Sequence, residues 1–156
     1  MNLDINIQDL SDENNSTFLM ELIKAIKNKY PDVPIHIALT VYEDYYKEVK
    51  DNLYITGLVY TYSEVPIDNV GIIKKNLEQN LRLDHLEYDW YNEVHISQLM
   101  MNRYNLNYIP SFIELAKEYN LSGELESAIH WRNRALHLAK KASDDSIIKE
   151  IEQLKF

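Results

Sequence analysis

Five side chains between residues 84 and 95 are of the types that perform acid–base chemistry: Asp84, His85, Glu87, Asp89 and His95. A positioned carboxylate or imidazole can transfer a proton to or from a substrate. A hydrated acidic loop has the same composition, however, and no nucleophile or cofactor motif lies near it. A small stand-alone enzyme that uses the Asp84–His95 loop is therefore the alternative interpretation and not the main one.

A second group, His130, Arg134 and His137, recurs at intervals of four and three residues, which places the three side chains on one face of a helix. Two helical histidines that share a metal normally lie one turn apart, and these two lie about two turns apart. The Arg134 guanidinium between them would also repel a cation. We therefore expect no metal here, and we interpret the group as an exposed polar stripe.

A third group is suited to recognition of a partner. The run MNRYNLNY at residues 101–108 brings Asn, Arg and Tyr together just before a helical pattern. Asn and Arg supply directional hydrogen bonds, and Tyr supplies a stacking surface. The alternative is that Asn and Arg satisfy backbone groups at a junction in the fold. The predicted binding surface for a peptide or glycan consists of Arg103, Tyr104, Asn107, Tyr108, Trp131 and Arg134.

Several kinds of chemistry are absent from the sequence. It has no glycine-rich phosphate loop, no Gly-x-Ser-x-Gly elbow and no His-Glu-x-x-His pair. It also has no cysteine, which excludes disulfides, thiolate nucleophiles and thiolate zinc sites. We therefore expect neither a cofactor nor a catalytic residue in this chain.

The formal charge of −9 is unevenly distributed. Residues 1–91 contain 16 acidic and 8 basic residues, a net −8, and residues 92–156 contain 9 and 8, a net −1. An acidic first half repels phosphate backbones, so we expect no nucleic-acid partner. The N-terminus lacks the features of a signal peptide, and the longest apolar run, IHIALTV, is too short to span a bilayer. The composition predicts a soluble chain without direct membrane insertion, and its length fits a single domain over residues 1–156.

The pattern of residues 1–80 predicts an α/β part. Residues 2–7 alternate as in a short strand or an ordered arm. Further along are helical patterns at 17–30 and 69–80, strand patterns at 35–41 and 58–65, and a short polar helix at 42–52. A helix between two strands predicts a parallel pair with a right-handed crossover.

Residues 93–156 predict a helical part. A helix over 93–107 has apolar residues spaced for burial at Ile96, Leu99, Met100 and Tyr104. Pro110 separates it from the next helix. Ser143 or Asp144 can cap a last helix, in which Ile147, Ile148, Ile151 and Leu154 would cover the preceding helices.

Between these two helices, residues 108–141 predict a helical hairpin that turns at Ser122-Gly123. The helix-spaced residues are Phe112, Leu115, Ala116 and Tyr119 before the turn, and Ala128, Trp131 and Ala135 after it. This is the order of a tetratricopeptide-type packing unit. No second copy precedes it. The predicted fold class is α+β or α/β: a small two- to three-stranded sheet with helices, followed by a helical bundle with one tetratricopeptide-like hairpin.

Three runs of the chain resemble a known family. They are VPIHIALTV at residues 33–41, YITGLVYTYSEVPID at 54–68, and the run at 100–136, which covers most of the predicted hairpin. The family is a bacterial group of multi-spanning membrane proteins, of unknown function, related to protein O-mannosyltransferases of the glycosyltransferase-C type. Val33 and His36 depart from the family, which tends to have arginine and an aromatic residue there.

The resemblance implies that the chain is the soluble C-terminal part of such a protein. Any transferase chemistry would belong to a membrane-embedded region that is not in this sequence, so no catalytic residue is carried over. We predict a non-catalytic accessory domain that binds a protein or glycan acceptor and the membrane-embedded part of its parent protein. It would lie on the periplasmic side of the inner membrane, whereas a stand-alone protein would be cytoplasmic. A purely structural domain is a third hypothesis.

Overall fold

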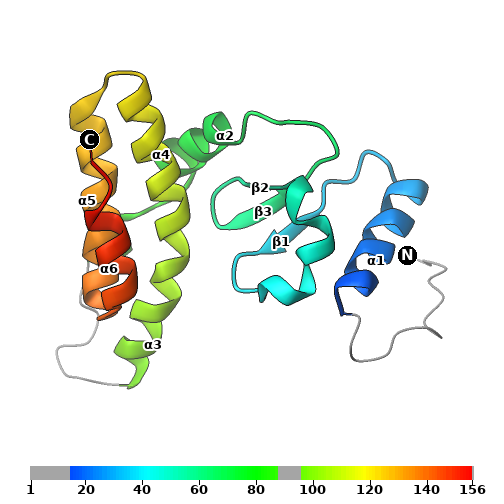
Figure 1. Cartoon of the computed structure of the whole chain (residues 1–156), viewed down its shortest axis with the longest axis horizontal. Helices are drawn as coiled ribbons and strands as arrows, with labels where there is room; N and C mark the ends of the chain where they lie inside the picture. The colour runs from blue at the N-terminus through cyan, green and yellow to red at the C-terminus, as the bar shows by residue number, and fades with distance from the viewer. Residues whose placement is uncertain (1–14, 88–95, 156) are drawn as a thin grey trace. The chain divides into compact units, whose positions relative to one another are not determined.

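The computed structural model describes residues 15–87 and 96–155. The fold class is α+β, as predicted, because a three-stranded antiparallel sheet near the N-terminus is followed by helices (Figure 1). The predicted strand or arm at residues 2–7 lies outside the described residues. None of the helices in the described part is long and apolar enough to cross a membrane.

The chain divides into two units, and each is described by itself. Unit 1 consists of the described residues up to Tyr54 together with Val59–Ile67. Unit 2 consists of Ile55–Leu58 and the described residues from Asp68 onward. Residues 69–80, which the sequence pattern groups with the α/β part, therefore belong to the helical unit.

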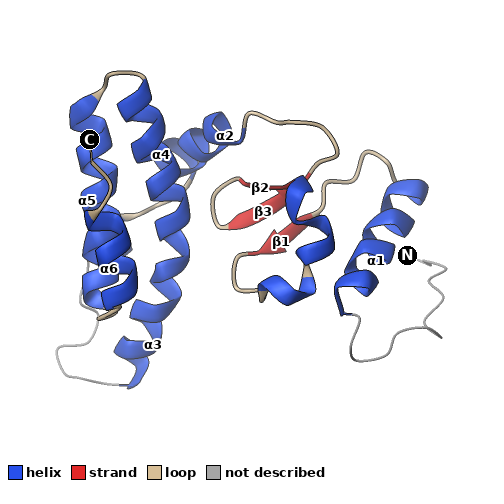
Figure 2. Cartoon of the chain, viewed as in Figure 1, coloured by secondary structure: helices blue, strands red, loops and turns tan. Residues whose placement is uncertain are grey.

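Unit 1 combines one helix with the sheet. Its elements are α1 (Asn15–Lys29), β1 (His36–Ala38), 3-10 turns at Glu43–Tyr45 and Lys47–Asn52, β2 (Leu53–Ile55) and β3 (Val59–Tyr62). The last residue of β2, Ile55, is assigned to unit 2. The strand order is β1-β3-β2, with β3 in the middle (Figure 2). β1 and β3 are antiparallel, and Ile37 lies opposite Tyr60.

The prediction of a parallel strand pair is wrong. Residues 42–52 do not form a crossover helix but short 3-10 turns. A parallel connection needs about a dozen residues or more, usually as an α-helix. Here the chain forms β2 directly after the turns and reverses over Thr56–Leu58. Gly57 has a φ of 137° in this reversal, a backbone conformation that side chains disfavour.

The core of unit 1 is small. Ile23 of α1, Ile37 of β1, and Tyr46 and Val49 of the 3-10 turns are buried together. The Tyr46 and Tyr60 ring centroids are 5.4 Å apart. Burial and a hydrogen bond with Tyr60 raise the pKa of Tyr46 to about 12.

Unit 2 is helical. Its elements are α2 (Asn69–Lys75), a π-helical turn at Asn76–Asn80, a 3-10 turn at Asp84–Leu86, α3 (Ile96–Asn105), a 3-10 turn at Leu106–Tyr108, α4 (Ile109–Leu121), α5 (Leu125–Lys141) and α6 (Asp145–Glu152). α4 and α5 lie side by side (Figure 1). Pro110 lies in the first turn of α4, where its missing N–H is tolerated, and so marks the start of the second of the two helices that were predicted on either side of it.

The predicted hairpin is confirmed. α4 and α5 turn at Ser122-Gly123, and Gly123 has a φ of 80° that favours glycine. All seven predicted packing residues are buried: Phe112, Leu115, Ala116, Tyr119, Ala128, Trp131 and Ala135. Ala116, Ala128 and Ala135 are fully buried where the two helices meet. Their small side chains allow the helices to approach closely.

The predicted cap of the last helix is also confirmed. The Asp144 carboxylate accepts a hydrogen bond of 3.1 Å from the Ile147 N–H at the start of α6. Ile151 is buried against the hairpin, and Ile147 and Ile148 are partly buried there. α6 therefore covers part of the hairpin, as expected for a terminal helix.

The predicted burial in α3 is wrong for three residues. Leu99, Met100 and Tyr104 are 56%, 51% and 56% exposed. The polar pair Gln98 and Asn102 occupies a different face, where Asn102 Nδ2 donates to the Lys141 carbonyl oxygen at 2.9 Å. This hydrogen bond to the end of α5 places the Asn102 side of α3 against the hairpin, so the apolar side faces away. Ile96, the fourth predicted residue, starts the helix.

Candidate functional site

Three of the predicted binding residues meet in the core of unit 2. Tyr108, Trp131 and Arg134 surround the buried Phe112. The Phe112 ring centroid is 5.9 Å from that of Tyr108 and 5.1 Å from that of Trp131. The Arg134 guanidinium lies 5.3 Å from the Phe112 ring centroid and 5.5 Å from that of Trp131. Since Trp131 is only 5% exposed, this cluster packs the helices and offers little surface to a ligand.

The other three predicted binding residues lie on or just after α3. Arg103 and Tyr104 are exposed. Asn107 Nδ2 donates to the Tyr104 carbonyl oxygen at 2.8 Å and so satisfies a backbone group at the end of the helix. This is the alternative role that the sequence suggests for the asparagine.

Arg134 also holds the segment that precedes α3. Its Nη2 donates to the Leu83 carbonyl oxygen at 3.2 Å and lies 3.4 Å from a Glu87 carboxylate oxygen. The second Glu87 oxygen is 3.7 Å from His137 Nε2. The prediction of an exposed polar stripe is wrong for Arg134, whose side chain is 19% exposed, while His130 stays on the surface.

The described members of the acid–base loop have structural partners. Asp84 pairs with Arg82 at 3.2 Å. Partial burial alone would raise the pKa of the Asp84 carboxyl, but the hydrogen bond and charge of Arg82 outweigh it and lower that pKa. His85 Nε2 lies 3.4 Å from the Tyr108 hydroxyl, and the two rings meet edge to face at 5.9 Å. Burial raises the pKa of the Tyr108 phenol.

Two further members of that loop, Asp89 and His95, lie outside the described residues. Within the described part of the chain, no group of three or more His, Asp or Glu side chains could hold a metal ion. The geometry of the described loop residues is that of a segment packed on α4 and α5. It does not place a base next to a nucleophile.

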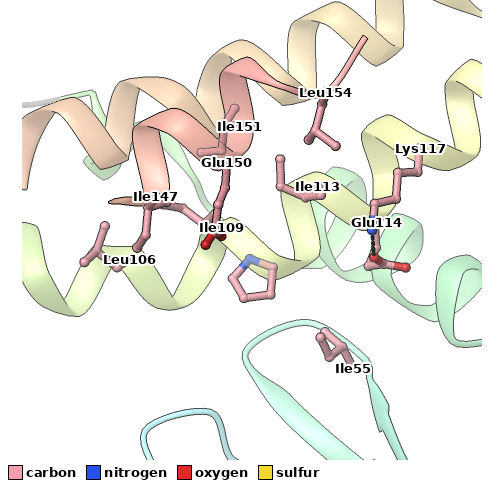
Figure 3. Close-up of a pocket in the computed structure, with 11 residues that line it drawn as sticks. Ile55, Leu106, Ile109, Ile113, Glu114, Lys117, Ile147, Glu150, Ile151 and Leu154 are labelled. Carbon is pink, nitrogen blue, oxygen red and sulfur yellow. Dashed lines mark hydrogen bonds and ion pairs between the residues drawn. The ribbon is translucent and has the colours of Figure 1, made fainter. Parts of the chain in front are cut away.

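A groove in unit 2 is a better candidate for a functional site. It has a volume of about 440 Å³, within the range of about 300–1,000 Å³ that is typical of ligand pockets. α4 forms one wall and α6 another, and Ile55 lies across from them (Figure 3). The lining residues are Ile55, Leu106, Ile109, Pro110, Ile113, Glu114, Lys117, Ile147, Glu150, Ile151 and Leu154.

The two helices expose apolar side chains here because each has a wider apolar face than the hairpin core uses. Phe112 and Ala116 of α4 point into the core, whereas Ile113 is only partly buried. Ile147 of α6 and Leu154, just after the end of α6, are likewise partly exposed. The spacing of these residues was visible in the sequence. The groove was not, because it requires α4 and α6 to be adjacent.

Two hydrogen bonds position Ile55 in the groove. The Asn76 side-chain amide donates to the Thr56 carbonyl oxygen at 2.7 Å. The fully buried Ser111 hydroxyl donates to the Gly57 carbonyl oxygen at 2.5 Å. Residues 55–58 are thereby fastened to α4 and to the turn after α2.

The groove has three charged side chains. Lys117 Nζ and Glu114 Oε1 form an ion pair of 2.8 Å on α4. Glu150 is exposed on α6, and none of the ion pairs among the described residues includes it. Two acids and one base give the groove a net charge of −1, and Glu150 is its uncompensated charge.

Two smaller hollows flank Tyr119 and are more polar. Their volumes are about 290 and 360 Å³. The Tyr119 hydroxyl donates to Glu78 Oε1 at 2.5 Å, and Lys74 Nζ lies 4.6 Å from the ring centroid. Burial, and then the bond to Glu78, raise the pKa of Tyr119. The polar groups there bind one another, whereas the α4–α6 groove is lined mostly by aliphatic side chains.

Comparison of the chain with models of protein families, with curated proteins and with solved structures found no match. The α4–α6 groove is therefore the main support for a functional interpretation. The resemblance to a membrane-protein family stays a prediction.

Proposed function

We propose that this chain is a non-catalytic binding module, and that its α4–α6 groove receives an apolar segment of a polypeptide. The observation that carries this proposal is the lining of the groove, where eight of the eleven residues are apolar. Burial of aliphatic surface drives such binding without demanding exact hydrogen-bond geometry. The hairpin supports the same role, because tetratricopeptide-type units present packed helices to other chains.

The lining favours a polypeptide over a glycan. Its apolar members are isoleucine, leucine and proline, with no aromatic ring and no side-chain amide. These aliphatic walls suit leucine-like anchors of a helix placed in a groove. A sugar would leave its hydroxyl groups without partners against them, and burial of unpaired hydroxyls costs free energy.

The binding role also agrees with the state of the described acid–base residues. His85 and Glu87 contact Tyr108 and Arg134 and so pack this segment on α4 and α5, while Asp84 pairs with Arg82 within the segment. These contacts support a structural role for the described part of the loop.

The resemblance described above extends the proposal to a parent protein. In this extension the module belongs to a membrane protein of the glycosyltransferase-C type, on the periplasmic side, and receives a segment of that protein or of a protein acceptor. The reading frame upstream of Met1 tests the extension. A series of apolar spans encoded there supports it, and an independent start without such spans contradicts it.

The groove itself is tested with random 12-residue peptides displayed on phage and selected on the whole chain. We expect selected peptides to be rich in leucine, isoleucine and phenylalanine, and to shift the NMR signals of Ile113 and Ile147. Ile113→Asp and Leu154→Asp should each weaken binding about tenfold or more, because a charge would replace buried apolar surface. Leu121→Asp is the matched control, since Leu121 ends the same helix, is 81% exposed and lies outside the groove.

Circular dichroism establishes that the variants are folded. Peptides that bind both groove variants as tightly as the unmodified chain, or that shift signals elsewhere, would overturn the proposal. Selection of glycans and not of peptides on the same chain would replace the polypeptide with a sugar ligand.

A further inference from the structure

The exposed face of α3 is a second apolar surface in unit 2. Leu99, Met100 and Tyr104 are each more than half exposed, and Met101 is 42% exposed. Monomeric proteins rarely leave large apolar side chains exposed in one contiguous patch, and such patches mark interaction sites. Met100 and Tyr104 are four residues apart and so lie on one line along the helix.

The only charged residue of α3 lies at the edge of this face. Arg103 is exposed, and the other nine residues of Ile96–Asn105 are uncharged. Leu99 and Arg103 are also four residues apart, next to the line of Met100 and Tyr104. α3 therefore presents an apolar face with one positive charge, and the groove presents apolar walls with one uncompensated negative charge.

The dimensions of the two surfaces also match. α3 has ten residues and is about 15 Å long. The side of the groove formed by the 3-10 turn and α4, from Leu106 to Lys117, has twelve residues and is about 18 Å long at the helical rise. α3 is thus short enough to fit within the length of the groove.

We infer that the occupant of the groove is α3 of a second copy of this chain, with Arg103 of one copy against Glu150 of the other. This inference rests on the proposed function, since it names the polypeptide that the groove receives. α3 directly precedes Leu106, which lines the end of the groove. A two-fold axis near this residue lets each copy place its α3 in the groove of the other, which gives a closed dimer.

Sedimentation velocity over a wide range of chain concentration tests the inference. The 18.5 kDa chain should show a concentration-dependent dimer. Met100→Glu should abolish the dimer, because it puts a charge at the centre of the α3 face. Met100 is exposed, so this variant should fold normally. Leu121→Asp should leave the dimer unchanged.

A charge swap tests the pairing itself. Arg103→Glu and Glu150→Lys should each weaken self-association about threefold or more, since repulsion replaces a modest surface attraction. The double variant, Arg103→Glu with Glu150→Lys, should restore it to within about twofold of the unmodified chain. Additive losses in the double variant would overturn the assigned pairing.

The outcomes separate the inference from the proposed function. If the chain remains monomeric at every concentration and yet binds selected peptides in the groove, the second-copy inference is wrong and the binding-module proposal is supported. A dimer that Met100→Glu does not affect also overturns the inference. A chain that neither dimerises nor binds peptides in the groove contradicts both proposals.

Discussion

Unit 1 and unit 2 differ in how much they bury. Among the described residues, fifteen buried hydrophobic residues form the core of unit 2, and four form that of unit 1. The difference follows from their elements. Long helices in unit 2 place an apolar residue on the same face every three or four positions, whereas strands of three or four residues in unit 1 bury few side chains each.

The comparison teaches that the two units depend on different interactions. Unit 2 depends on close packing around Phe112. Unit 1 has only a four-residue core, to which local hydrogen bonds such as that from the Glu48 N–H to the Ser16 hydroxyl are added. The candidate groove belongs to the unit with the larger core, which can hold apolar residues in place at its surface.

The largest expected effect is that of Phe112→Ala. Phe112 is 0% exposed, so the substitution should lower the free energy of unfolding by about 3–5 kcal/mol, measured by urea denaturation. Phe18→Ala in unit 1 is the matched control. Phe18 is 37% exposed, so its loss should cost about 1 kcal/mol or less. An equal loss of unfolding free energy in the two variants would contradict the proposed difference between a core phenylalanine and an exposed one.

Next comes Ile23→Ala at the centre of the unit 1 core. Ile23 is 2% exposed, and its truncation should cost about 2 kcal/mol, the lower end of the range for such changes. The small core has room to relax around the cavity. Hydrogen exchange of the α1 and β1 amides measures the loss. A cost as large as that of Phe112→Ala would show that core size does not distinguish the units.

Two buried serines sharpen the comparison at a smaller scale. Ser111→Ala leaves the buried Gly57 carbonyl without its donor and should cost about 1–3 kcal/mol. Ser16→Ala removes the acceptor of the Glu48 N–H. Because Glu48 is exposed, water can replace that acceptor, and the cost should be about 1 kcal/mol or less. Thermal denaturation of both variants shows which substitution destabilises the chain more. A larger loss of stability for Ser16→Ala than for Ser111→Ala would contradict the prediction.

The last prediction concerns alkaline pH. The pKa of Tyr46 is raised from 10.0 to about 12, mainly by burial and then by its hydrogen bond with Tyr60. The raised pKa means that folding favours the neutral phenol. This contribution is fully present below pH 10 and is lost as pH rises from 10 towards 12.

Titration of tyrosinate absorbance, compared with that of Tyr46→Phe, identifies the residue. The last tyrosine to ionise before unfolding should be missing in the variant. If the titration curve of the variant above pH 11 is unchanged, the late ionisation belongs to a residue other than Tyr46.

Much of the fold of unit 2 could be predicted because its signals are local. The spacing of Phe112, Leu115 and Ala116, the turn at Gly123 and the cap at Asp144 all act within one or two helical turns. Two strands of the sheet, β1 and β3, could be located in the same way, whereas β2 was not recognised. Their antiparallel order could not, since it depends on whether residues 42–52 form a crossover helix.

The candidate site was less predictable. Tyr108, Trp131 and Arg134 are recognisable as residues that can contact a partner, but type alone does not tell a surface residue from one that packs on Phe112. The groove combines Ile55, Ile113 and Ile147, which are far apart in the sequence, so no local pattern contains it. Leu99 and Met100 have the spacing of core residues and yet lie on the surface.

The sequence by itself therefore determined where the longer helices and two of the three strands lie, where the hairpin turns, and which chemistry is missing without cysteine. These depend on the backbone preferences and apolar spacing of neighbouring residues. Only the tertiary structure decided the direction of the strands, the face of α3 that meets α5, and the groove between α4 and α6. These depend on which apolar faces pack together, and an apolar face in the sequence specifies that it is buried somewhere without specifying its partner.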